Sequence, residues 1–236
     1  IKEAMKTYEA PRGISVSFTG EQEKQAKEMS FLSGALMIAV FLIFLILVAQ
    51  FNSASTPFII LTTVVLSLIG VFMGLIIFRM EFVIMMTMIG IISLAGIVVN
   101  NAIVLIDYTN LLIDRKKAEL GLDENEKLDI NILRELIVES GMKRLRPVLL
   151  TAITTVLGLI PLATGMNVDF FSLMAHNDPK IFFGGDNVIF WGPMSWAVIY
   201  GLTFATFLTL VIVPVMFFMM KKVQLRMANR SKRLSA

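Results

Sequence analysis

The residues best suited to chemistry lie on and just after an apolar run, from Phe82 to Ile106, that is long enough to cross a bilayer. At about 100° per residue, its small and polar side chains fall within about 60° on one helix face: Ser93, Gly96, Asn100 and Asp107. A second amide, Asn101, stands beside the first. Because an unpaired amide in hydrocarbon costs several kcal/mol, this face must meet protein or a water-lined cavity. It predicts either a polar functional site or tight helix packing through small residues and one interhelical hydrogen bond.

A second polar face belongs to the apolar segment that begins at Pro147. If the helix continues through this proline, four residues share one face within about 60°: Arg144, Thr151, Thr155 and Gly158. Pro147 could shift that helical phase. Two simpler interpretations stay open. Arg144 and Arg146 could be anchors that reach the lipid headgroups, and the hydroxyls of Thr151, Thr154 and Thr155 could donate to their own helix.

The composition is that of a membrane protein. Of 236 residues, 56% are apolar and 17% charged, whereas soluble domains are about 45–50% apolar and about 25% charged. There is no cysteine and one histidine, His176, in a polar connection, so neither a thiolate nor a histidine metal centre is expected. The 16 methionines favour core packing over a soft-metal path. The net charge of +3 gives no support for nucleic-acid binding.

Five apolar segments are each near the ~20 residues that a spanning helix needs, so we expect an all-α membrane protein. They cover residues 31–48, 57–78, 82–106, 147–164 and 196–220 of a transmembrane bundle at 30–220. Gly70 and Gly74 in the second segment, together with Gly96 in the third, predict close helix packing.

The distribution of Lys and Arg predicts the orientation. Eight lie in the connection at 107–146 and six in the tail at 221–236, but only one in the loop at 165–195. By the positive-inside rule the connection and the C-terminal tail are cytoplasmic, and the 165–195 loop and residues 1–29 are periplasmic. Within the connection, residues 130–143 predict an amphipathic helix lying at the membrane interface.

Residues 1–29 are water-soluble in character. Residues 13–20 alternate apolar and polar side chains between two glycines, which is typical of a half-buried strand. A strand cannot stand alone, so we expect this one to be the last strand of a larger extramembrane domain. The chain opens without Met and its first segment is charged, so we expect no signal peptide here and expect the chain to be part of a longer protein.

Several motifs together resemble the resistance-nodulation-division (RND) permeases of the hydrophobe/amphiphile efflux branch, to which AcrB belongs. They are Gly96–Tyr108 (GIVVNNAIVLIDY), Arg144–Thr151 (RLRPVLLT), Phe190–Pro193 (FWGP) and Ala205–Val215 (ATFLTLVIVPV). The resemblance implies the last five of twelve spans, with a short residual strand of the periplasmic porter domain in front. It also implies a homotrimer in the bacterial inner membrane that exports amphiphiles in exchange for protons. The implied partners are the N-terminal half of the same permease, a periplasmic adaptor, an outer-membrane channel and membrane lipid.

The resemblance gives the polar faces a meaning. In the family, an acidic pair in the first half exchanges protons with the help of a Lys, an Arg and a Thr from the second half. Arg144 and Thr151 match the Arg and the Thr, but Asn100 stands at the Lys position. An amide can hydrogen-bond to a carboxylate but cannot act as its mobile counter-charge. The predicted relay also includes the neighbouring polar residues Asn101, Thr155 and Asp107.

Alternative functions stay open within and beyond this class. Within transport, a heavy-metal efflux pump of the RND type is the second hypothesis. From a different class, a membrane-embedded structural or assembly factor, like the export relatives of RND pumps, is the alternative. An intramembrane enzyme is not expected, because no span carries paired carboxylates, His or Cys. The resemblance implies no cofactor; the proton motive force would drive transport.

Overall fold

The computed structural model describes residues 20–51, 53, 55–123, 128–169, 174, 176 and 180–234, with the side chains of 227–234 excepted. Its helices are α2 (Glu21–Phe51), α3 (Ser55–Ile77), α4 (Ile84–Glu119), α5 (Ile130–Thr164) and α7 (Asp186–Leu234). Each of these five is long and apolar enough to cross a membrane. The prediction of five helices that are long and apolar enough to span a membrane is therefore confirmed, whereas the expected strand at 13–20 lies outside the described residues.

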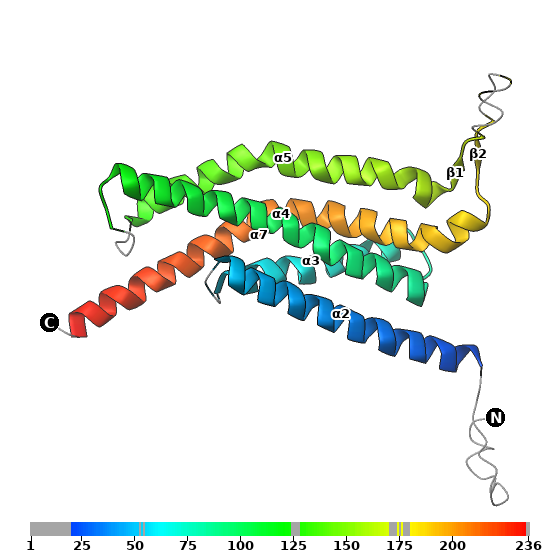
Figure 1. The fold of residues 1–236 in the computed structure, drawn as a ribbon, viewed down its shortest axis with the longest axis horizontal. Coiled ribbons are helices and arrows are strands. Elements are labelled where there is room, and N and C mark those ends of the chain that lie inside the picture. Colours follow the sequence, from blue (N-terminus) through cyan, green and yellow to red (C-terminus); the bar gives the residue numbers. More distant parts are fainter. Residues whose placement is uncertain are drawn as a thin grey trace, which may run out of the picture.

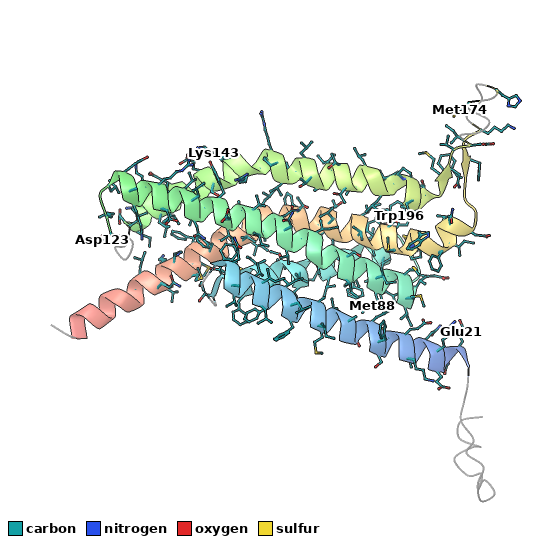
Figure 2. All side chains as sticks on the ribbon, in the orientation of Figure 1. Glu21, Met88, Asp123, Lys143, Met174 and Trp196 are labelled. Atoms are coloured by element: carbon teal, nitrogen blue, oxygen red, sulfur yellow. The ribbon has the colours of Figure 1, made fainter. Side chains whose placement is uncertain are left out.

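The five helices run side by side along the length of the molecule, with α7 packed against α3, α4 and α5 (Figure 1). The start of α2 and the end of α7 lie at opposite ends of the bundle, as an odd number of spans requires. The α4–α5 connection lies at the same end as the C-terminal part of α7. Figure 2 accordingly places Asp123 at one end of the molecule and Met174 at the other.

A short sheet, which the sequence did not predict, follows α5. The strands β1 (Met166–Asn167) and β2 (Phe182–Phe183) pair antiparallel. Gly165 ends α5 with a φ of 66°, a left-handed conformation that suits glycine. The side chain of Asn167 donates to the carbonyl oxygens of Gly165 and Gly184, at 2.8 and 2.9 Å, which ties the two ends of this loop together.

The α4–α5 connection is far more helical than expected. Helix α4 continues 13 residues beyond the predicted end of its span at Ile106, to Glu119. Helix α5 begins at Ile130, capped by the Asp129 carboxylate, and passes through Pro147 as one helix. The helical phase considered for Arg144 and Thr151 therefore survives the proline.

The expected interfacial helix at 130–143 needs correction. Its apolar residues are buried against the extension of α4, in one core cluster that contains Leu112, Ile113, Leu133, Leu136 and Ile137. These two helix segments each present apolar residues at helical spacing, so they bury them against each other rather than against lipid. A helical hairpin thus projects beyond the predicted spans.

Candidate functional site

The two polar faces predicted from the sequence meet in one groove between α4 and α5. The groove has a volume of about 430 Å³. From α4 it is lined by Ser93, Gly96, Ile97, Asn100 and Asn101, and from α5 by Thr151, Ala152 and Thr155. Ser93, Gly96 and Asn100 are exposed on the surface of the chain. The structure therefore brings the polar residues of both helices together and leaves them open.

The two asparagines occupy different depths. Asn100 is exposed, whereas Asn101 is 8% exposed, at the base of the groove. Among the described residues, neither amide side chain forms a hydrogen bond. Since each amide offers two donors and an acceptor, the groove presents unused hydrogen-bonding capacity within the predicted span at 82–106.

The threonine hydroxyls of α5 donate hydrogen bonds to backbone carbonyl oxygens of their own helix. Thr151 donates to the carbonyl oxygen of Val148 at 2.9 Å, and Thr155 donates to that of Thr151 at 2.8 Å. Thr154 donates in the same way to Leu150. This is the simpler interpretation that the sequence left open, but it does not exhaust the hydroxyl groups, because each oxygen can still accept a hydrogen bond inside the groove.

Arg144 lies beyond the groove, because it is two helical turns before Thr151. Its guanidinium carbon is 4.2 Å from the centroid of the Tyr108 ring. The Nε atom is buried and has no hydrogen-bond acceptor in the part of the chain that the structure describes. Arg144 therefore packs against protein rather than extending freely as a headgroup anchor.

Two charged neighbours lie close to this contact. Asp107 is exposed and does not line the groove, although it is on the same helix. Lys143, beyond the predicted span at 147–164, pairs with Glu139 at 2.6 Å. This hydrogen bond and the carboxylate's charge raise the pKa of the Lys143 ammonium.

A hydrogen bond between buried hydroxyls, which sequence reasoning missed, fixes the α4–α5 hairpin beside Arg144. The Oγ1 atom of Thr109 and the Oγ atom of Ser140 are 2.7 Å apart, and Thr109 is also 2.8 Å from the carbonyl oxygen of Leu105. Ser140 is fully buried. The helical spacing of Ser140 and Arg144, one turn apart, was the available sequence signal.

The three glycines singled out for packing have different surroundings. A Cβ atom added at Gly70 would lie 2.6 Å from Cβ of Phe204, and one at Gly74 would lie 2.2 Å from Cγ of Tyr200. Both glycines therefore allow α3 to approach α7. Around Gly96, in contrast, an added Cβ would meet no atom of the described chain within 4 Å. Gly96 widens the groove and has no packing partner among these residues.

The described residues hold no group of three or more His, Cys, Asp or Glu side chains able to bind a metal ion. The densest methionine group of the sequence is divided between environments: Met86 and Met88 are buried in the core, whereas Met85 is 36% exposed. The packing role expected for these methionines fits the positions of Met86 and Met88.

Comparisons with known proteins agree with the arrangement of the spans. The sequence model of the AcrB/AcrD/AcrF family matches residues 1–168. The swarming motility protein SwrC of Bacillus subtilis is 36% identical over 222 residues, which are 94% of this chain and 18% of that protein. The multidrug resistance protein MdtC of Erwinia tasmaniensis is 25% identical over 226 residues, 96% of this chain and 19% of MdtC.

Among solved structures, a crystal structure of a heavy metal efflux pump superposes with a TM-score of 0.67 at 25% identity. The match covers 93% of this chain and 18% of that pump. The chain thus spans about a fifth of the length of the relatives it matches.

Proposed function

Because the chain belongs to the AcrB/AcrD/AcrF family of RND permeases, we propose that it forms the second-half membrane part of a twelve-span, proton-coupled efflux permease. The observation that carries the proposal is the open groove between α4 and α5 with its two unbonded amides. In hydrocarbon these groups need a partner, and this chain supplies none among the residues described. A carboxylate from the first half would satisfy them.

In this proposal the residues of the groove have separate roles. Asn100 and Asn101 donate hydrogen bonds to the ionised carboxylate, and the oxygens of Thr151 and Thr155 accept from its protonated form. Arg144 supplies the positive charge, because Asn100 carries none. Asp107 lies outside the groove, so we assign it no direct contact with the transferred proton.

For the substrate we favour hydrophobic or amphiphilic compounds. The relatives named as multidrug resistance proteins support this class. Heavy-metal cations are the second candidate, supported by the solved structures named as heavy metal efflux pumps. Efflux of a cationic dye and of Zn²⁺, measured on the same vesicles, separates the two, because only the transported class drives counterflow of protons.

The location and the partners follow from the same proposal. The permease would lie in the bacterial inner membrane as a homotrimer, with a periplasmic adaptor and, where an outer membrane exists, a channel. Residues 1–29 and the loop at 165–195 would be periplasmic, and the C-terminus cytoplasmic, as the Lys and Arg distribution requires.

The decisive test compares three variants of the complete permease, normalised to membrane protein level. Arg144→Ala removes the counter-charge and should reduce proton-coupled efflux about tenfold or more, which corresponds to about 1.4 kcal/mol or more. Asn100→Leu should reduce transport more than stability, since leucine fills the space but makes no hydrogen bond. Asn100→Lys should be the best tolerated, because it restores the residue that the family carries.

Helix packing alone gives the opposite order. Lysine, which is larger and charged, would then be the most disruptive change at Asn100, and Arg144→Ala would be nearly silent. Near wild-type efflux by Arg144→Ala would therefore exclude the proposed relay.

A further inference from the structure

The contact between Arg144 and Tyr108 has a geometry that stabilises the guanidinium incompletely. The guanidinium carbon is 4.2 Å from the ring centroid, well inside the ~6 Å over which a cation is attracted to an aromatic face. The Nε donor, however, is buried without an acceptor among the described residues. A buried donor left unpaired opposes the attraction to the ring. The stacked position is therefore one from which a better acceptor can draw the guanidinium away.

The charged and titratable groups around Arg144 do not fix it in this position. On α5, Lys143 is paired with Glu139, and its ammonium also interacts with the Tyr108 hydroxyl. On α4, Asp107 is exposed next to Tyr108. Helix α7, which also packs against α5, has no charged residue between Asp186 and Lys221. Within the described chain Arg144 forms no ion pair, so the Tyr108 ring is its principal contact.

The contact also lies at the end of the groove. Tyr108 follows Asn100 by eight residues and Arg144 precedes Thr151 by seven, which places both about 10–12 Å along their helices from the groove. The hydrogen bond between Thr109 and Ser140 holds the two helix backbones together at this level. The side chain of Arg144, with its four rotatable bonds, can thus move while the backbones beneath it stay in place.

We propose that Tyr108 is a positioning residue, whose ring holds the guanidinium of Arg144 outside the groove until a carboxylate in the groove attracts it. This inference rests on the proposed function, because that carboxylate belongs to the proton relay. The Arg144 side chain then has two positions, one on the ring and one toward the groove. The difference in free energy between these positions determines how often the counter-charge is near the carboxylate.

The two side chains must consequently have opposite effects on the pH dependence of transport. Without the ring, Arg144 is more often near the groove, where its charge favours the ionised form of the carboxylate. A lower pH is then needed to protonate that carboxylate. Without Arg144, the ionised form loses its counter-charge and protonation occurs at a higher pH. A substitution that only loosened the helix packing would lower the transport rate without changing the pH at which the carboxylate is protonated.

The experiment uses the complete permease in proteoliposomes, with the internal pH fixed and the initial rate of proton-coupled efflux measured against external pH. For Tyr108→Leu we expect the pH of half-maximal rate to fall by roughly half a unit, given the strength of such contacts. Tyr108→Phe, the matched control, keeps the ring face and should keep the wild-type value. In the Arg144→Ala background, Tyr108→Leu should cause no further shift.

A second readout does not depend on the relay. Phenylglyoxal modifies accessible guanidinium groups, and mass spectrometry of the peptide that contains Arg144 gives the rate. Tyr108→Leu should raise this rate several-fold, whereas Tyr108→Phe should not. Should Tyr108→Leu fail to assemble, Tyr108→Met removes the ring while keeping most of the volume.

These results separate the two proposals. An unchanged modification rate, or a shift to higher pH in Tyr108→Leu, overturns the positioning role of Tyr108. If Arg144→Ala leaves transport unchanged while Tyr108→Leu still raises the modification rate, the relay is wrong and the holding contact stands. If the shift in Tyr108→Leu persists without Arg144, Tyr108 acts by another route and the inference fails.

Discussion

Replacement of Gly74 by alanine should destabilise the bundle more than its single methyl group suggests. The new Cβ would lie 2.2 Å from Cγ and 2.5 Å from Cβ of Tyr200. An ordinary contact between carbon atoms is about 3.5–4.0 Å, so α3 and α7 must separate by roughly 1.5 Å or the tyrosine must leave its rotamer. Neither adjustment is confined to the end of a flexible side chain.

Tyr200 is held from three directions, which makes the second adjustment costly. Its ring stacks on Phe78 at 5.0 Å and on Trp196 at 5.3 Å, between centroids. Its hydroxyl donates to the sulfur of Met80 at 3.3 Å. Overpacking typically costs about 1–3 kcal/mol, and a disturbed aromatic pair about 0.5–1.5 kcal/mol. Against this stands a gain of about 0.5–1 kcal/mol because alanine favours the helix over glycine.

We therefore expect a net loss of about 1–3 kcal/mol for Gly74→Ala, seen as a lower thermal midpoint for the detergent-solubilised protein. Gly34→Ala is the matched control, because the added Cβ on α2 would meet no atom of a neighbouring helix within 4 Å among the described residues, and it should leave the midpoint unchanged or slightly higher. In a Tyr200→Ala background the cost of Gly74→Ala should largely disappear. A Gly74→Ala protein as stable as the wild type would refute the packing argument.

Two further predictions concern orientation and the hairpin. Cysteines introduced by Asp123→Cys and Met174→Cys, at opposite ends of the molecule (Figure 2), should differ in intact cells: an impermeant thiol reagent should label only the second, and labelling of the first would reverse the proposed topology. Ser140→Ala should lower the free energy of unfolding by about 0.5–1.5 kcal/mol, since it removes a buried hydroxyl that is bonded to Thr109 at 2.7 Å and to the carbonyl oxygen of Leu105 at 3.4 Å, while Thr109 keeps its own contact with Leu105. Thr109→Val measured alone and in combination should show non-additive losses, and strict additivity would argue against this bond.

The sequence was sufficient for the spans and for the polar faces, because both depend on local periodicity. Runs of about 20 apolar residues leave little choice in lipid. Asn100 and Thr151 reach the same groove because each lies on the polar face of its own helix. The helical hairpin was not predicted as such, although Leu112 and Leu136 lie on apolar faces that the sequence shows. An amphipathic face indicates that something covers it, and only the fold determines whether lipid or protein does so.

Contacts between distant residues were beyond sequence reasoning. Tyr108 and Arg144 are separated by 36 residues and meet only if α5 stays helical through Pro147 and turns a particular side toward α4. The small residues make the same point. Gly74 and Gly96 were both predicted to allow close helix packing, yet one lies against Tyr200 and the other faces open space. A glycine in the sequence indicates that another helix can approach closely at that position. Whether a helix does so depends on how the neighbouring helices are arranged.

The interface between α4 and α5 contains polar groups with a hydrogen-bond partner and polar groups without one. The groups without a partner indicate where another segment should dock. Thr109 and Ser140 satisfy each other, whereas the amides of Asn100 and Asn101 have no partner among the described residues. The large exposed side chains of α2, such as Phe31, Met37 and Ile38, are apolar and need no partner in lipid. An unpaired amide at the same depth costs several kcal/mol. Under the proposed function, the first half of the permease should therefore cover the groove between α4 and α5 and leave the apolar face of α2 to lipid.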